Sequence, residues 1–116
     1  MIRRDEILEV FAKLREFIAA EPRLASFLPA ADELHKQAQA FAQGTTRIPP
    51  LTLQSSDAMP DRDSARAIVL IMSKLPALDG DETTDLARAY ATLLGNLADG
   101  ITVAIYKSYP EVVPRD

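Results

Sequence analysis

The strongest structural signal in this chain lies in residues 86–105, which read LARAYATLLGNLADGITVAI. At about 100° per residue, the apolar positions of this segment form two adjoining stripes on one helix. One stripe consists of Leu86, Tyr90, Leu93, Leu97 and Ile101, and the other is rich in alanine and glycine. An apolar face this broad needs neighbours on two sides. We therefore predict a central bundle helix, whose first stripe is either a helix-packing face or the seam of a dimer.

This last helix is predicted to begin between residues 81 and 84 and to reach Tyr109, because Pro110 cannot continue it. Its narrow polar strip includes Thr92, Asn96 and Asp99. The low charge of residues 89–106 also raises the alternative of a membrane span. Asn96 and Asp99 would be costly in hydrocarbon, so the pattern favours a bundle helix and no membrane insertion.

Three further helices are predicted upstream. Residues 5–20 repeat apolar positions at spacings of three and four, and Pro22 ends this helix or opens a short turn. Residues 29–43 form an alanine-rich helix with Gly44 as its C-terminal cap. A helix from Asp61 or Asp63 to Leu75 has a centre that is apolar on every side, which indicates that other elements surround it.

Residues 44–60 contain Pro49, Pro50 and Pro60 and are predicted to form a long loop. Apolar residues along it, such as Ile48 and Leu51, indicate a segment that packs on its own domain or docks on a partner, and we favour the first. The predicted fold is an all-α, antiparallel bundle of about four helices with one long proline-containing loop. Residues 1–109 form the single domain and residues 110–116 an extended tail.

Composition narrows the functional classes. The 116-residue chain has a globular composition, no cysteine, a net charge of −4 and a sequence pI near 4.9. The charge has the wrong sign for general attraction to nucleic acid or anionic membranes. We read no secretory signal at the N-terminus, and the expected location is the cytoplasm.

Five basic residues in the first quarter of the chain keep a nucleic-acid alternative open. They are Arg3, Arg4, Lys13, Arg15 and Arg23. A basic patch on one helix face would attract phosphate, whereas the simpler interpretation is a solvated helix surface.

Two patterns suggest a metal site, and neither is complete. Asp79, Asp81, Thr83 and Asp85 alternate like the start of a calcium loop, but Thr84 and Tyr90 stand where glycine and glutamate are required. Asp32 and His35 have the carboxylate-x-x-histidine spacing of a di-iron bundle, but only one copy is present. A metal-using oligomer is kept as a second alternative. The preferred interpretation has no metal and no cofactor.

Catalytic motifs are absent from the sequence. His35 is the only histidine, and no nucleophile elbow marks any serine. The four glycines are dispersed, so neither a phosphate-binding loop nor a dinucleotide fingerprint exists. We therefore predict that the chain is not an enzyme.

Two segments look available for binding a protein partner. The first consists of Arg47, Ile48, Pro49, Pro50 and Leu51, and the second includes Tyr109, Pro110, Val112 and Val113. Prolines favour extended conformations that dock with little loss of entropy. The sequence suggests no particular family. It predicts a protein-interaction module, either an accessory subunit of a larger assembly or a small regulator or inhibitor of a protein target, with a homodimer also considered.

Overall fold

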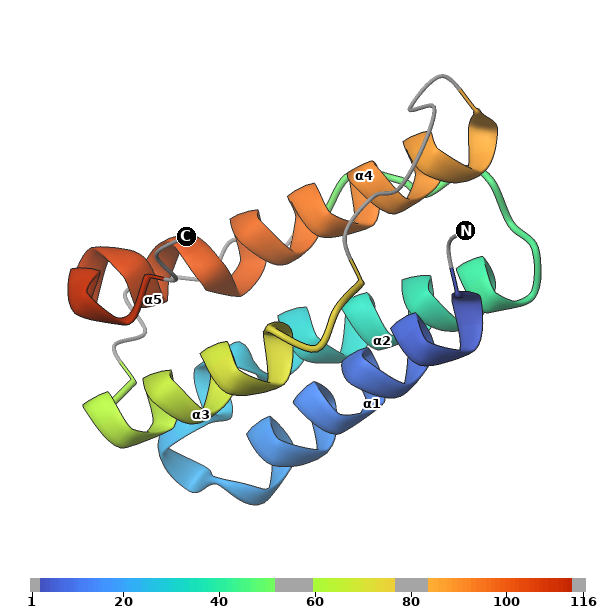
Figure 1. Ribbon diagram of the computed structural model, residues 1–116. Helices are drawn as coiled ribbons and strands as arrows, with labels where there is room; N and C mark the ends of the chain where they lie inside the picture. Colours follow the sequence, from blue (N-terminus) through green and yellow to red (C-terminus); the bar gives the residue numbers. More distant parts are fainter. Residues whose placement is uncertain (1–2, 52–59, 77–83, 114–116) are drawn as a thin grey trace.

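The computed structural model describes residues 3–51, 60–76 and 84–113, and these residues contain helices and no strand. The α-helices are α1 (Arg4–Ala20), α2 (Leu28–Ala42), α3 (Arg62–Met72), α4 (Asp85–Leu97) and α5 (Val103–Ser108). Two 3-10 helices, η1 (Pro22–Phe27) and η3 (Pro110–Val112), and one π turn, η2 (Ala98–Thr102), complete the set. Since α4, η2 and α5 follow one another without a break, the fold is the predicted all-α bundle of four principal helices (Figure 1).

The first half of the bundle follows the sequence closely. The buried residues of α1 include Ile7, Phe11, Leu14 and Ile18, which recur at spacings of three and four. Pro22 opens η1 rather than continuing α1, because its ring fixes φ and it has no N–H to donate. The predicted turn after α1 is therefore confirmed.

The end of α2 is a Schellman motif built on Gly44. This residue has φ of 105°, a conformation that favours glycine. Its N–H donates to the Phe41 carbonyl (3.0 Å), and the N–H of Thr45 donates to the Ala40 carbonyl (3.0 Å). Two helix-end carbonyls thereby gain partners, as the predicted cap requires.

Helix α3 begins at the Asp61 cap, whose carboxylate accepts a hydrogen bond from the Ser64 N–H (3.2 Å). The prediction that other elements surround its centre is wrong. Ile68 is completely buried, but Leu70 is 63% exposed. The reason is that α3 lies at the edge of the bundle, where it packs mainly against α1 and η3.

The last helical rod begins at Thr84, whose hydroxyl accepts a hydrogen bond from the Ala87 N–H (3.1 Å). It ends at Ser108, one residue before the predicted end. The prediction missed the π turn between α4 and α5, where the Val103 N–H donates to the carbonyl of Ala98, five residues back. This turn allows both Gly100 and Ile101 to face the interior.

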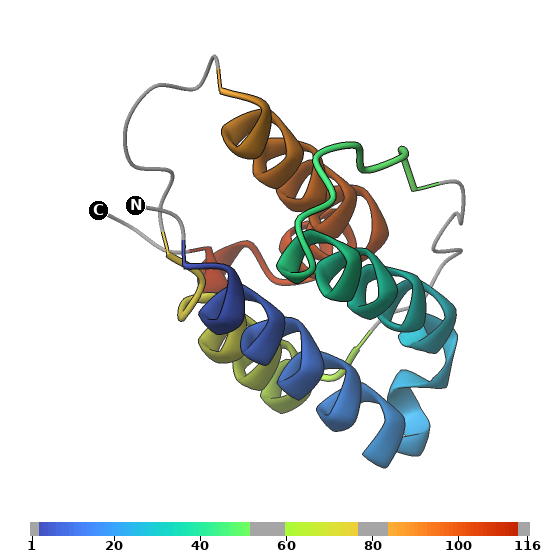
Figure 2. The same ribbon diagram turned by 90° about the vertical axis from the view of Figure 1, so that its right-hand side faces the viewer.

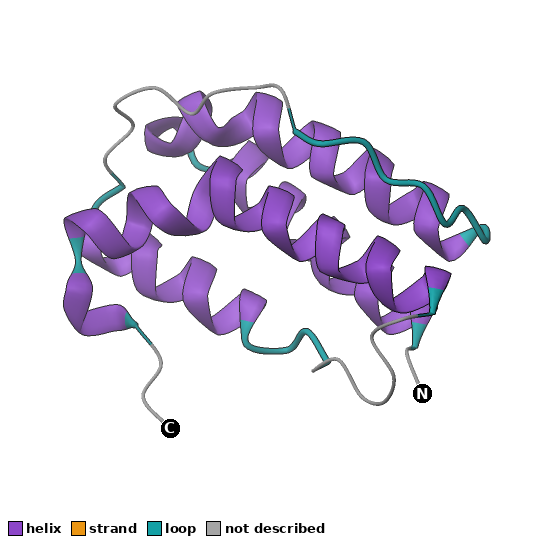
Figure 3. Cartoon of the chain, turned by 90° about the horizontal axis from the view of Figure 1, so that it is seen from above, coloured by secondary structure: helices purple, strands orange, loops and turns teal. Residues whose placement is uncertain are grey.

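The helices are connected with one crossover. Arg4 lies near Phe41, so α2 ends beside the start of α1, whereas Arg23 contacts Asp61, so α3 begins beside the far end of α1. Hence α2 and α3 run in the same direction, and α1 lies between them (Figures 1 and 2). The long loop must therefore return along the bundle, and Figure 3 shows its described part passing over the helices.

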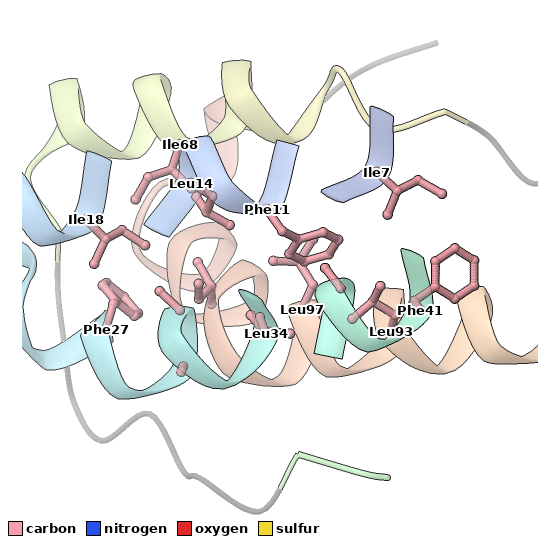
Figure 4. Packing of buried hydrophobic residues seen from close by; sticks show 14 of the residues in the cluster. Ile7, Phe11, Leu14, Ile18, Phe27, Leu34, Phe41, Ile68, Leu93 and Leu97 are labelled. Carbon is pink, nitrogen blue, oxygen red and sulfur yellow. The ribbon is translucent and has the colours of Figure 1, made fainter. Parts of the chain in front are cut away.

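A single hydrophobic core joins all four helices. Figure 4 shows Phe11 and Leu14 of α1 facing Leu34 of α2 and Leu97 of α4, while Ile68 reaches the same core from α3. Phe41 and Tyr90 close one end, with ring centroids 5.9 Å apart. Burial raises the pKa of Tyr90 to about 12, and its hydroxyl donates to the Pro76 carbonyl (2.6 Å).

Candidate protein-interaction surface

The five basic residues behind the nucleic-acid alternative all have partners within the chain. Four of them contact carboxylates: Arg3 pairs with Glu6 (2.9 Å), Lys13 with Glu9 (3.4 Å), Arg15 with Asp32, and Arg23 with Glu21 (3.0 Å). The guanidinium of Arg4 instead lies 6.0 Å from the centre of the Phe41 ring. A phosphate group would have to compete with carboxylates at four of these positions.

Arg23 of η1 contacts carboxylates at the end of α1 and at the start of α3. Its hydrogen bond to Glu21 lowers the pKa of that carboxyl and raises the pKa of the guanidinium. The same guanidinium lies 3.7 Å from Asp61, the cap of α3, whose own pKa is lowered chiefly by the Ser64 hydrogen bond. These interactions fix the start of α3 against η1, so they explain structure without requiring a ligand.

The metal alternatives gain no geometric support. Asp32 is held by Arg15, and His35 is half-buried next to it on α2. Across the described residues, no three histidine, aspartate or glutamate side chains form a group that could hold a metal ion. Of the calcium-like pattern, Asp79, Asp81 and Thr83 lie outside the described residues, and Asp85 is in the first turn of α4.

The predicted binding segment of the long loop is fastened to its own bundle. Ile48 is buried and Leu51 is half-buried, whereas Arg47, Pro49 and Pro50 are exposed. The backbone of this segment contacts α4 through the Leu51 N–H, which donates to Asn96 Oδ1 (3.0 Å). Packing on its own domain therefore describes residues 47–51, while residues 52–59 of the loop lie outside the described part.

Asn96 is the polar residue that sequence reasoning misplaced. We expected it on the wet side of the last helix, but it is 4% exposed. Its Nδ2 donates to Gln37 Oε1 (2.8 Å) and to the Pro49 carbonyl (2.9 Å), and Gln37 Nε2 donates to that carbonyl as well (3.2 Å). The only sign of its burial in the sequence was that Asn96 lies one helical turn from both Leu93 and Gly100, which are apolar.

The predicted seam residues of the last helix lie inside the single chain. Tyr90, Leu93, Leu97 and Ile101 are buried in the core, and Leu86 is half-buried. Figure 4 shows Leu93 and Leu97 among side chains of α1 and α2. These positions serve helix packing, so a dimer would need another surface.

The C-terminal segment does not begin as an extended tail. Residues 110–112 form η3, because Pro110 occupies the first position of a 3-10 turn. Tyr109 lies 5.8 Å beneath the Arg62 guanidinium, and Arg62 also pairs with Glu111 (3.3 Å). Val112 is half-buried against the core, and Val113 is 37% exposed. Residues 114–116 lie outside the described residues.

An apolar groove lies between α3 and η3. It has a volume of about 340 Å³ and is lined by Arg66, Val69, Leu70, Ser73, Glu111 and Val112. Three of them lie on α3 and Ser73 is its C-cap; the four are spaced i, i+3, i+4 and i+7, so they share one face of the helix. The opposite face of α3 buries Ile68, which leaves this groove face as the outer side of an amphipathic helix. We call it the α3–η3 groove.

Two other hollows are more polar. One, of about 470 Å³, is lined by Arg3, Arg4, Asp5, Glu6 and Ala42. The other, of about 270 Å³, is lined by Glu6, Glu9, Val10, Lys13, Ile71 and Lys74. Their charged walls are partly neutralised by the ion pairs of α1, so the α3–η3 groove is the stronger candidate for binding through apolar contacts.

Comparisons with protein-family models, with curated proteins and with solved structures found no significant match. Among the described helices, none is both long enough and apolar enough to cross a membrane. The fold and its surface therefore define the class: an all-α, four-helix bundle with one crossover connection and an exposed apolar groove at its edge helix.

Proposed function

We propose that this chain is a non-enzymatic protein-interaction module, either an accessory subunit of a larger assembly or a small regulator or inhibitor of a protein target. The observation that carries the proposal is the α3–η3 groove. Leu70 is the most exposed of the large apolar residues that stand out on the described surface, and it lies on this groove. A partner that covered it would gain about 1–2 kcal/mol from that side chain alone.

The groove suits the recognition of a helix or an extended apolar segment. Val69, Leu70 and Val112 supply apolar lining, while the exposed Arg66 and Glu111 add one charge of each sign. Interfaces between proteins commonly combine an apolar centre with a charged or polar rim. The same features give a phosphate backbone little to bind, which is why the protein partner is preferred to nucleic acid.

The test is affinity isolation of the 116-residue chain from the cytoplasmic fraction of its native host, the compartment that we propose, followed by mass spectrometry. Leu70→Asp places a charge in the α3–η3 groove and should reduce recovery of a genuine partner at least tenfold. Val103→Asp is the matched control, because Val103 is also an exposed apolar residue (47%) but does not line the groove. Circular dichroism checks that both variants remain folded.

Equal recovery with wild type and Leu70→Asp would exclude this groove as the functional surface. A partner lost in Val103→Asp but retained in Leu70→Asp would move the binding site to α5.

A further inference from the structure

The α3–η3 groove has a ridge and a hollow side by side. Leu70 is 63% exposed, and it lines the hollow together with Val69 and Val112. A surface that carries both shapes can match itself across a twofold axis, since the ridge of each copy then enters the hollow of the other. With this shape, a second copy of the chain can cover the apolar side chains, and no other protein is needed.

The charges of the groove are also self-complementary. Arg66 makes no ion pair with any described residue, and the Arg62 contact to Glu111 uses only Oε1 of that carboxylate. Across a twofold axis, Arg66 of each copy can approach Glu111 of the partner subunit. A different partner would need one cation and one anion in matching positions, whereas a second copy supplies both by symmetry.

The local charge balance selects this face over the rest of the surface. Two copies that each carry a net charge of −4 repel one another when acidic faces meet. At the groove, Arg66 and the neighbouring Arg62 stand with Glu111, so this face carries no excess of acidic side chains. The outer side of α1, by contrast, presents Glu9 and Glu16 with only Lys13 between them, and Lys13 pairs with Glu9. Two copies that meet at this face therefore do not bring acidic surfaces together.

We propose that the α3–η3 groove binds a second copy of this chain in a twofold dimer, with Leu70 in the partner's hollow and Arg66 at the partner's Glu111. This inference rests on the proposed function, because it names the occupant of the same groove. The dimer is weak. Helix α3 has 11 residues and is about 16 Å long, so the contact is at or below the roughly 800 Å² per partner of a standard interface.

The first experiment is sedimentation velocity of the full chain from about 5 to about 500 µM, a range chosen for a Kd in the micromolar region. Wild type and Val103→Asp should shift from monomer to dimer with concentration. Leu70→Asp should stay monomeric throughout while keeping its helical circular dichroism. A wild-type chain that remains monomeric at the highest concentration overturns the proposal, and so does a dimer that Leu70→Asp leaves intact.

The second experiment tests the pairing by charge. Arg66→Glu places two carboxylates opposite each other, and Glu111→Arg places two guanidinium groups there, so each variant alone should dimerise at least tenfold more weakly than wild type. Their equimolar mixture restores both opposite-charge pairs and should recover the dimer as a heterodimer. A mixture that stays monomeric overturns the assigned pairing of Arg66 with Glu111.

The two proposals can fail separately. If the chain is monomeric but Leu70→Asp still loses a different protein in affinity isolation, the groove binds that protein and the dimer is wrong. If the chain dimerises through Leu70 but captures no other protein, the dimer stands, and the role as a subunit or regulator of another target fails.

Discussion

Asn96 is a single polar residue on which three separate segments depend. Its amide joins Gln37 of α2 to the backbone of Pro49 and Leu51 in the long loop. Buried polar networks specify one arrangement when every group is paired, and they are costly when one member is removed. The loop is therefore held in place by hydrogen bonds from α2 and α4 as well as by the burial of Ile48.

Asn96→Ala should lower the free energy of unfolding by about 2–4 kcal/mol, because it leaves Gln37 Oε1 and the Leu51 N–H without their partner and removes one of the two donors to the Pro49 carbonyl. Urea denaturation followed by circular dichroism measures this change. Thr92→Ala is the control on the same helix, since the Thr92 hydroxyl bonds only to the Arg88 carbonyl (3.0 Å), and it should change the stability by about 0.5 kcal/mol or less. Equal effects of the two substitutions would show that the network adds nothing to stability.

At the level of elements, the π turn allows α4 and α5 to act as one rod that approaches the loop and α2 closely. A Cβ atom at Gly100 would lie 2.7 Å from Leu51 Cδ2 and 3.3 Å from the Ala30 Cβ, whereas at Gly95 it would meet nothing within 4 Å. The two glycines of this rod thus have different reasons to be glycine. Only Gly100 is required by packing.

Gly95→Ala should stabilise the chain by about 0.5–1 kcal/mol, because alanine favours a helix interior over glycine. Gly100→Ala should be less stable than Gly95→Ala by about 1–3 kcal/mol, because Leu51 or Ala30 must move. Thermal unfolding of both variants beside wild type gives the comparison. If Gly100→Ala were the more stable of the two, the close approach of the rod to Leu51 would be wrong.

Elements with local chemical signals were predictable from the sequence. Pro22, Gly44 and Thr84 mark helix ends through φ restriction, a positive φ and a capping hydroxyl, and each acts within four residues of itself. The position of α3 in the bundle was not predictable. The run from Ile68 to Met72 contains no polar residue that shows which side faces water.

The candidate site was missed for the same reason. The α3–η3 groove joins residues 66–73 to residues 111 and 112, which are about 40 positions apart in the sequence. Its existence depends on where α3 lies relative to η3, and this is a tertiary relationship that no local pattern records. The two proline-containing segments were conspicuous instead. One of them proved to be fastened to the bundle, and the other supplies a wall of the groove.

In the whole molecule, α3 packs chiefly on two neighbours, α1 and η3. α1 and α2 pack along their lengths, and α4 packs on α2, but α3 has α1 on one side and η3 on the other. The Arg62–Glu111 ion pair and the partly buried Val112 connect η3 to it. The C-terminal segment therefore packs on α3 at the edge of the bundle and forms one side of the α3–η3 groove.

Deleting residues 110–116 should release α3 before α1 and α2, because η3 packs on α3. Amide hydrogen exchange, measured at a concentration low enough to keep the chain monomeric, should show a loss of protection in Arg62–Met72 equivalent to roughly 1–2 kcal/mol, with a smaller loss in α1 and α2. Deleting only residues 114–116 keeps η3 and should leave the protection of α3 near that of the full chain. Because α1 and α2 hold each other without η3, an equal loss in all helices would contradict this division and indicate that the bundle opens as one cooperative unit.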